Sequence, residues 1–501
     1  MRSHKIHRFE LAALTLLVSF ALAACNQTKA SGRSDGTVPD NGKIPITTKS
    51  EEAKKEFLQG RELFERLLAN DSLQHFDKAL ALDPDFSLAE LSRANASPTA
   101  KDFFDHLNKA VSTADKASEG ERLMILANQA GANGDAAKQK DLLEKLVAAF
   151  PNDERAHFAL GTYYFGQQDF GAAVDHFKRA TEIAPAYSTA YNILGYAYRQ
   201  QGDYASAENA FKKYVELIPN DPNPYDSYAE LLLRMGKFDD SITQYRKALS
   251  VDGHFMASHF GIAADLMYLN KPQEAMAELQ KMAAAARNDG ELRTALFGMA
   301  VVSADSGRFD QALQDVDKQF AVAEKKKDAA AMAGDLQAKG NIYLQMKKYD
   351  EARKNFDRSL QIIQDSDLSP EIKENAKRQH HYNLAVVAAG KNDLATAKAE
   401  AEEFSKAAEA SNNVVQTRQS HELQGILALG QKDYEHAIVE LQQANQQNPQ
   451  NLYRLSQAYA GKGDSGKAQE IAAKAGSFNS LPQLNYAFVR TKAQKASGRK
   501  A

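Results

Sequence analysis

The stretch that decides the fold runs from residue 161 to residue 219 and reads GTYYFGQQDFGAAVDHFKRATEIAPAYSTAYNILGYAYRQQGDYASAENAFKKYVELIP. Written as two rows offset by 34 residues, it repeats itself, with small residues on small ones, aromatic on aromatic and proline on proline. A fixed period of this length is typical of a repeat architecture, in which one supersecondary unit is copied along the chain. The matching positions are Gly161 and Gly195, Tyr164 and Tyr198, Ala173 and Ala207, Phe177 and Phe211, and Pro185 and Pro219.

Each matching column has a physical cause. A glycine inside a helix costs up to about 1 kcal/mol relative to alanine, so Gly161 and Gly195 are expected where a second helix approaches closely. Aromatic residues such as Phe177 and Phe211 fill the space between helices, and burying each contributes roughly 1.5–3 kcal/mol. A proline such as Pro185 ends the second helix, because it cannot continue the hydrogen-bond ladder. The columns therefore predict antiparallel pairs of helices that stack on one another.

This pattern resembles the tetratricopeptide repeat, a helix–turn–helix unit of 34 residues with small, aromatic and proline positions in fixed order. Weaker matches extend the frame from Gly60 to Ala468, with an irregular stretch at residues 94–117. The resemblance implies an all-α fold, a right-handed superhelical α-solenoid of about ten to eleven helix pairs over residues 51–480. Residues 481–501 are predicted to form a capping helix and a frayed basic tail. An irregular all-α protein with chance periodicity is the alternative.

The first 24 residues have the pattern of an export signal. Basic residues come first, and the apolar stretch Leu11–Leu22 is shorter than the roughly 20 residues that a membrane span needs. The sequence Leu22-Ala23-Ala24-Cys25 resembles the lipobox of bacterial lipoproteins. The resemblance implies that Cys25 is acylated and becomes the mature N-terminus. An ordinary secretory signal with a chance cysteine is the alternative.

Residues 25–50 are rich in Ser, Thr, Gly and Lys and poor in apolar side chains. Such a composition cannot form a core, so we interpret it as a flexible linker between the lipidated Cys25 and the folded body. Asn26 follows the cysteine, which by resemblance to enterobacterial sorting favours the outer membrane, with the body facing the periplasm.

Composition excludes several classes of function. Lys and Arg number 62 against 65 Asp and Glu, a formal net charge of −3, so no basic surface favours nucleic acid. The single cysteine excludes an intramolecular disulfide and a cysteine-based metal site within one chain. We find no phosphate loop, nucleophile elbow or His-Glu-x-x-His motif. The neighbouring His380 and His381 are interpreted as a surface pair, because adjacent helical residues point about 100° apart. The sequence therefore predicts neither an enzyme nor a bound cofactor or metal ion.

Resemblance to the family also implies where a partner binds. Positions 2, 5, 9 and 12 of each first helix face the concave groove, and aromatic side chains beside fixed polar groups suit a partner peptide or helix. The alternative is that the aromatic members only pack between helices. The known Lys/Asn/Arg clamp for a C-terminal carboxylate is missing from the best-matching repeats. The predicted groove residues are Arg155, Phe158, Thr162, Phe165, Asn192, Tyr196, Arg199, Asp226, Glu230, Phe260 and Met267.

Resemblance to tetratricopeptide lipoproteins implies a membrane-anchored scaffold of the bacterial envelope that binds a protein or peptide. The rival interpretation is a lipoprotein that captures a glycan or peptide for an outer-membrane transporter. The regular repeat argues mildly against the rival, because such proteins usually interrupt their helices with long ligand loops.

Overall fold

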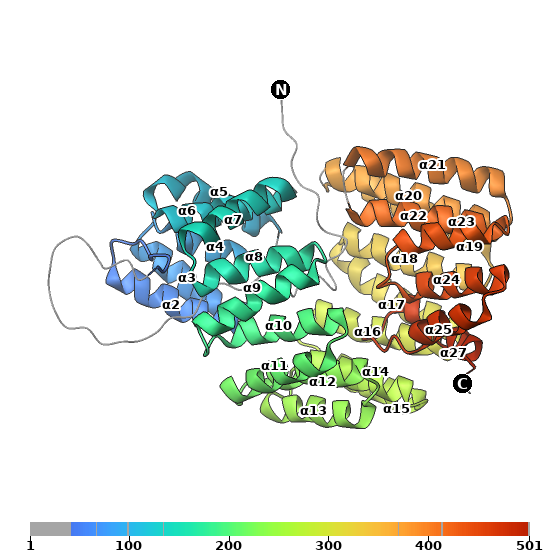
Figure 1. Cartoon of the computed structure of the whole chain (residues 1–501), viewed down its shortest axis with the longest axis horizontal. Coiled ribbons are helices and arrows are strands. Elements are labelled where there is room, and N and C mark those ends of the chain that lie inside the picture. The colour runs from blue at the N-terminus through green and yellow to red at the C-terminus, as the bar shows by residue number, and fades with distance from the viewer. Residues whose placement is uncertain are drawn as a thin grey trace. The chain divides into compact units, whose positions relative to one another are not determined.

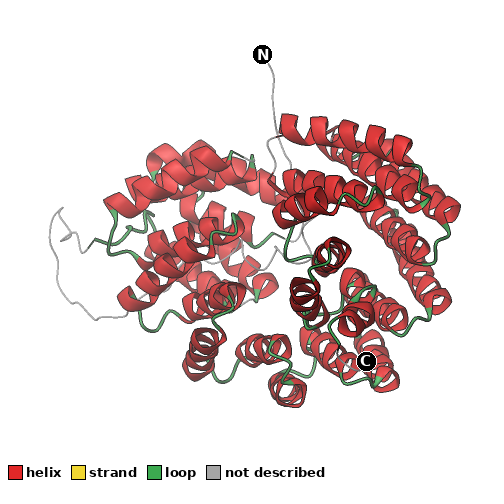
Figure 2. Ribbon diagram, turned by 45° about the vertical axis from the view of Figure 1, so that its right-hand side comes forward, coloured by secondary structure: helices red, strands yellow, loops and turns green. Residues whose placement is uncertain are grey.

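The computed structural model describes residues 42–498, apart from residues 67, 98, 99, 134, 369, 412 and 413. These residues form helices joined by turns and contain no strand (Figure 2). The predicted export signal and Cys25 lie outside the described residues. The chain divides into two compact units, Met1–Leu231 and Leu232–Ala501. The fold class is all-α, as the sequence predicts.

The first unit is a succession of antiparallel helix pairs followed by the first part of α12 (Figure 1). Within each pair the two helices are close neighbours in the chain and pack on each other. The helices are α2 (Glu51–Glu65), α3 (Ala69–Leu82), α4 (Ser87–Asn95), α5 (Ala100–Thr113), the 3₁₀ turn η1 (Ala114–Lys116), α6 (Glu119–Ala132), α7 (Ala136–Ala149), α8 (Glu154–Gly166), α9 (Phe170–Ile183), α10 (Ser188–Gln201), α11 (Tyr204–Leu217) and α12 (Pro222–Arg234).

The second unit begins inside α12 and continues the same alternation. Its helices are α13 (Phe238–Val251), α14 (Met256–Tyr268), α15 (Pro272–Ala285), α16 (Asp289–Asp305), α17 (Phe309–Lys326), α18 (Ala329–Gln345), α19 (Tyr349–Asp365), α20 (Pro370–Gly390), α21 (Leu394–Ser411), α22 (Val414–Gly430), α23 (Tyr434–Gln443), α24 (Pro449–Lys462), α25 (Ser465–Gly476), α26 (Leu484–Ala487) and α27 (Arg490–Ala496).

The described residues contain twelve helix pairs, from α2/α3 to α24/α25, whereas the sequence predicts ten to eleven. The stretch at 94–117 that is irregular in the repeat frame belongs to the pair α4/α5. That pair has no glycine at the close approach, and α4 is only nine residues long. It is nevertheless built into the core by Leu88, Leu91 and Leu107, which are all buried.

The turn inside each pair has a recurring chemistry. The side chains of Asp169, Asp203 and Asp464 each accept a hydrogen bond from the backbone amide three residues on, at 2.9–3.1 Å, and so cap the second helix. The residue before two of these caps is a glycine with positive φ, Gly202 at +82° and Gly463 at +91°. Glycine adopts this left-handed conformation without steric strain, so the chain reverses within three or four residues.

The glycine column confirms the close approach of the paired helices. A Cβ atom on Gly161 would lie 2.8 Å from the ring of Phe177, and one on Gly340 would lie 2.3 Å from the ring of Phe356. Both phenylalanines are fully buried. Glycine and aromatic residue are therefore two halves of one contact, formed 16 residues apart within a pair.

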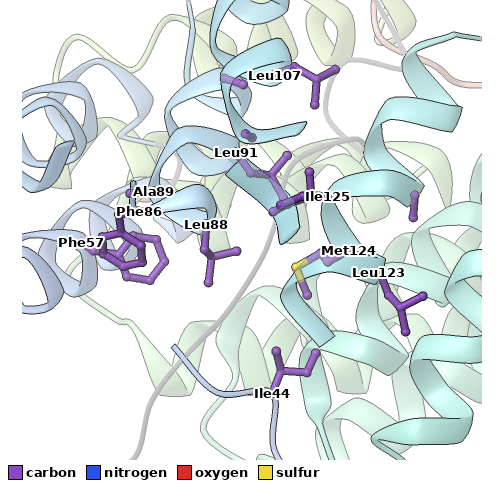
Figure 3. Close-up of a cluster of buried hydrophobic side chains, with 14 of the residues drawn as sticks. Ile44, Phe57, Phe86, Leu88, Ala89, Leu91, Leu107, Leu123, Met124 and Ile125 are labelled. Carbon is purple, nitrogen blue, oxygen red and sulfur yellow. The ribbon is translucent and has the colours of Figure 1, made fainter. Parts of the chain in front are cut away.

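Residues 42–50 differ from the predicted flexible linker, since in the structure they are bound along the first unit. The backbone amide of Ile44 donates to Asp153 at 2.8 Å, and that of Thr47 donates to Glu121 at 2.8 Å. The amide of Lys49 donates to Asp83 at 3.0 Å. Figure 3 shows the buried Ile44 beside α6, in the cluster that contains Leu123, Met124 and Ile125. We call residues 42–50 the N-terminal strap.

The C-terminal residues also differ from the prediction. α27 packs against α25, as a capping helix would. However, Arg490, at the start of the predicted basic tail, is buried and paired with Asp305 of α16. The described part of this tail, up to residue 498, is therefore a packed element at least over α27 and is not frayed.

Candidate functional site

α10, which is the first helix of its pair, carries a polar stripe on one face. Asn192, Tyr196 and Arg199 are spaced four and three residues apart, which places them above one another on a helix of 3.6 residues per turn. The next first helix, α12, carries Asp226 and Glu230 at the same kind of spacing. Other faces of α10 hold most of the residues that pack against α9 and α11, although Tyr196 of the stripe also packs on this core and on Phe211 of α11.

Side chains of the two helices meet in a cluster around Tyr196. Its hydroxyl donates to Oε2 of Glu230 at 3.0 Å and lies 3.3 Å from the hydroxyl of Ser227. Arg199 donates from Nη1 to Oε1 of Glu230 at 2.5 Å, and its guanidinium carbon lies 4.6 Å from the centre of the Tyr196 ring. The ring of Phe211 packs edge to face with the Tyr196 ring, and the two ring centres lie 5.2 Å apart. The cluster is therefore fixed from several sides.

The electrostatics keep the phenol of Tyr196 protonated. Burial raises the pKa of Tyr196 well above its ordinary value, and the neighbouring carboxylate of Glu230 raises it further. The phenol therefore stays a hydrogen-bond donor at every physiological pH. Glu230 and Arg199 form an ion pair whose side chains are only 17 % and 15 % exposed, so water screens it weakly. The cluster is a rigid, charge-compensated polar platform.

Asn192 lies one turn before Tyr196 and is only 6 % exposed. Its Oδ1 atom is buried and has no hydrogen-bond partner among the described residues. Leaving a buried acceptor unsatisfied costs about 1–3 kcal/mol, and such groups are rare in folded proteins. Because the atom is covered, a donor from outside would remove this cost only once the neighbouring side chains move aside. We call Asn192, Tyr196, Arg199, Ser227 and Glu230 the α10–α12 site.

The structure brings together only part of the predicted groove. Asn192, Tyr196, Arg199 and Glu230 share the α10–α12 site, and Asp226 is half-buried one turn before Glu230. Among the described residues, the predicted groove residues on the other helices do not come together at a single site.

Phe158 and Met267 are corrections to the predicted groove. Phe158 is 1 % exposed and packs between Phe177 and Tyr187, with both ring centres 5.4 Å away. Met267 is 2 % exposed. Position in the repeat places both residues on the inner side of a first helix, but both are buried, and Tyr187 at the start of the next pair packs against Phe158. They belong to the core, which is the alternative that the sequence left open.

The remaining groove residues have mixed roles. Arg155 is 6 % exposed, and it donates to Asp153 and to the carbonyl oxygen of Ile44 in the N-terminal strap. Thr162 donates to the carbonyl oxygen of Phe158 at 2.9 Å, and Phe165 is half-buried. Phe260 is half-buried in the second unit, close to Gly298 of α16. Arg155 thus holds the chain's own backbone.

Sequence reasoning missed three functional features. Ser227, the partner of Tyr196, stands one turn before the predicted Glu230 on the same helix, so helical spacing could have found it. Ile44 and Ile46 alternate with a proline inside a polar segment, which is the only local signal for the strap. The contact between Arg490 and Asp305 joins residues 185 apart and has no local signal.

The structure contains no metal-type cluster within its described part: no three His, Cys, Asp or Glu side chains converge there as ligands. His380 and His381 face different partners, Asp357 at 3.2 Å and Glu400 at 2.7 Å. Over the same described residues, every helix is too short or too polar to cross a membrane.

Comparison with known proteins identifies the repeat. Family models described as tetratricopeptide repeat match residues 126–188, 158–222 and 336–366. The fold is thus an α-solenoid of helix pairs. More particularly, the chain contains tetratricopeptide repeats, in residues 126–222 and 336–366.

Several solved structures are similar over part of the chain. The crystal structure of MamA protein is 20 % identical, with 33 % of this chain and 91 % of that chain covered and a TM-score of 0.30. MamA 41-end from Desulfovibrio magneticus RS-1 is 15 % identical, covering 33 % and 93 %, with a TM-score of 0.30. A tetratricopeptide repeat protein from Parabacteroides merdae is 15 % identical, covering 52 % and 98 %, with a TM-score of 0.38. A search of curated protein sequences gives no match.

Proposed function

We propose that the protein is a lipid-anchored scaffold of the bacterial envelope that binds a protein partner at the α10–α12 site. Tetratricopeptide repeats are built to present the faces of successive first helices to a partner. The observation that carries the proposal is the buried, unsatisfied Oδ1 of Asn192 beside the fixed cluster of Tyr196, Arg199 and Glu230. Several oriented polar groups and an aromatic ring suit the backbone of a peptide or one face of a helix.

The anchor rests on the sequence alone. Cys25 is the last residue of a lipobox-like tetrapeptide and is the only cysteine of the chain. Several acyl chains on one residue hold a protein firmly, whereas one chain binds a membrane only marginally. Asn26 favours the outer membrane and a body that faces the periplasm. Replacing Cys25 by Ala should move the protein from the membrane fraction to the soluble fraction. Retention in the membrane fraction would remove the lipid anchor from the proposal.

Partner binding is tested with a photo-cross-linking residue at position 226, beside the α10–α12 site. The expected result is one discrete cross-linked protein in cells. Asn192→Leu removes the unsatisfied acceptor, and Arg199→Ala removes the guanidinium, so each should reduce the cross-link about tenfold or more. Arg179→Ala is the matched control, because Arg179 makes only exposed polar contacts, with Glu182 on α9 and with Asn152. Equal cross-linking in all variants would exclude this site.

The same variants distinguish the rival function. A glycan-capturing protein would bind oligosaccharides in solution, and Arg199→Ala would weaken that binding. A protein scaffold would show the cross-linked partner and no saturable binding of oligosaccharides. The second pattern is the one we expect.

A further inference from the structure

The C-terminal segment of the second unit returns to helices that lie much earlier in the chain. After α25 ends at Gly476, residues 477–497 pass through α26 and α27 and contact α12, α14, α16 and α18. The large side chains of Phe478, Tyr486 and Phe488 in this segment are 7 %, 1 % and 3 % exposed. A helix that only capped the last pair would contact α24 and α25 alone.

The segment contacts one equivalent residue in each of four successive first helices. Each of these residues stands two positions before the left-handed turn residue that ends its helix: Gly236, Asn270, Gly307 or Lys347. The equivalent residues are therefore one row in the repeat frame. We call them the turn row: Arg234, Tyr268, Asp305 and Gln345.

The contacts run in register along the row. Arg234 donates to the carbonyl oxygen of Phe478, and Tyr268 donates to that of Ser480. Asp305 accepts from Arg490, and Gln345 accepts from Lys492 at 3.2 Å. Each successive contact along the segment thus reaches the next first helix.

The side chains of the turn row are chemically complementary to those of the C-terminal segment. The guanidinium of Arg234 lies 4.0 Å from the centre of the Phe478 ring, and the Tyr268 ring lies 5.5 Å from that of Tyr486, edge to face. Nε of Arg490 donates to Oδ1 of Asp305 at 2.7 Å, and Nη2 donates to Oδ2, so the pair is bidentate. Its side chains are only 8 % and 4 % exposed. Bidentate, buried pairs of this kind select for geometry as well as charge.

We propose that the turn row is a peptide-recognition surface and that its resident ligand is the chain's own C-terminal segment, which acts as a clasp on the second unit. The clasp is recognised by its two aromatic rings and its arginine, Phe478, Tyr486 and Arg490. A peptide that carries the same pattern therefore competes for the row when the clasp is released. This proposal depends neither on the lipid anchor nor on the α10–α12 site.

Tethering explains why the clasp occupies the row in the intact chain. A ligand joined by a short linker has an effective concentration on the order of millimolar, so a free peptide at micromolar concentration cannot displace it. Arg490 pairs with Asp305 and lies 5.6 Å from the centre of the Tyr268 ring, so weakening the clasp at this one residue, without touching the row, should expose the surface to a free peptide. Arg490→Asp does this, because it places a carboxylate against Asp305 and leaves all four row residues in place.

The experiment uses the full chain and a fluorescent peptide of residues 477–497. Arg490→Asp should speed hydrogen exchange in residues 478–496 by about tenfold or more, with exchange in α8 and α10 unchanged. It should also bind the peptide at least about a hundredfold more tightly than the wild type does. Combining Arg490→Asp with Asp305→Arg should restore slow exchange, since the pair is then reversed. The matched control Lys495→Asp, at an exposed position of α27, should behave as the wild type in both measurements.

Two results would overturn the proposal. One is slow exchange in residues 478–496 of Arg490→Asp. The other is equal peptide binding by Arg490→Asp and the wild type, including no binding by either. If exchange shows that Arg490→Asp unfolds α14 to α25 altogether, Phe478→Ala is measured in its place and judged by the same two results.

Discussion

Gly195 of α10 faces Phe211 of α11 so closely that a Cβ atom on Gly195 would lie 2.7 Å from the ring. Real Cβ atoms do not approach an aromatic carbon to this distance, so any side chain at this position must push the two helices apart. Phe211 is fully buried and also supports the ring of Tyr196. The absence of a side chain at Gly195 therefore sets the spacing between α10 and α11. It also allows Phe211 to lie where it supports Tyr196 in the α10–α12 site.

We expect Gly195→Val to destabilise the protein by about 1–3 kcal/mol or more, because overpacked cores relax only by shifting the backbone. The measurement is thermal or denaturant unfolding. Gly166→Val is the matched control, since a Cβ atom at Gly166 meets nothing within 4 Å. An unaltered midpoint for Gly195→Val would contradict the close approach.

Asp265 predicts a pH dependence of stability in the second unit. It is fully buried in α14, and burial raises the pKa of Asp265 to about 8 from 3.8, although the hydroxyl of Ser241 acts in the opposite direction. Between these values the folded state holds a proton that the unfolded state has lost. The free energy of unfolding should therefore fall by roughly 1.4 kcal/mol per pH unit from about pH 4 to about pH 8 through this group, and then level off.

Replacing Asp265 by Asn should remove this dependence and stabilise the protein at pH 7. The difference in unfolding free energy between Asp265→Asn and the wild type, measured from pH 5 to pH 8, should grow with pH. Asp240→Asn, at an exposed position of α13, is the control and should show a small, flat difference. A flat difference for Asp265→Asn as well would mean that the buried carboxyl is ionised in the folded state.

A histidine–glutamate contact recurs within helix pairs at a spacing of 19 residues. His259 meets Glu278, His381 meets Glu400 and His421 meets Glu440, with Nδ1 2.7–2.8 Å from a carboxylate oxygen. Each contact joins the first helix of a pair to the second. The contact therefore holds the two helices of a pair together on their polar side, as the contact between glycine and phenylalanine does on their apolar side.

The hydrogen bond from His259 and the interactions with Lys281 together lower the pKa of Glu278 to about 2, against the opposing effect of burial. The stabilisation by Glu278 should thus be present above about pH 4.5 and be lost as the pH falls towards 2. We expect Glu278→Gln to cost about 1–3 kcal/mol at pH 7 and less at pH 3, by chemical unfolding. Replacing the exposed Glu274 by Gln in the same helix is the control. A loss that does not shrink in acid would show that charge is not involved.

The N-terminal strap should stabilise the first unit. Asp153 accepts a hydrogen bond from the strap and is buried, and burial alone would raise its pKa. Arg155 and the amides of Ile44 and Ala156 outweigh the effect of burial and hold the pKa of Asp153 below its usual value. Ile44→Ala should lower stability by about 2 kcal/mol or more, because the side chain is 3 % exposed. Hydrogen exchange at residues 43–49 should quicken at the same time. Ile46→Ala, at a half-buried position, should have a smaller effect; equal effects would contradict a specific seat for Ile44.

Local spacing explains what the sequence could predict. Glycine and aromatic columns lie within one helix pair, so their period reveals the pairs directly, and helical spacing placed Asn192, Tyr196 and Arg199 on one stripe of α10. The pair α4/α5 escaped because its core is made of leucines without a glycine column. The two helices of this pair pack as those of the other pairs do, but their contacts do not produce a repeat in the sequence.

Burial by a neighbouring repeat is what the spacing could not predict. Phe158 occupies a groove position in its own repeat, yet Tyr187 from the start of the next pair covers it. The strap and the clasp are further removed, since Ile44 meets Asp153 and Arg490 meets Asp305 across more than a hundred residues. Such contacts depend on the curvature of a whole unit, which no local pattern encodes.

The seat of the strap also fixes the point at which the preceding chain leaves the first unit, beside the start of α8. Gly42 lies 17 residues after Cys25, a length that spans at most roughly 60 Å when fully extended. If Cys25 carries lipid, α8 cannot stand higher than this above the bilayer. The part of the first unit around Asp153 would then reach only those partners that come within that height of the membrane.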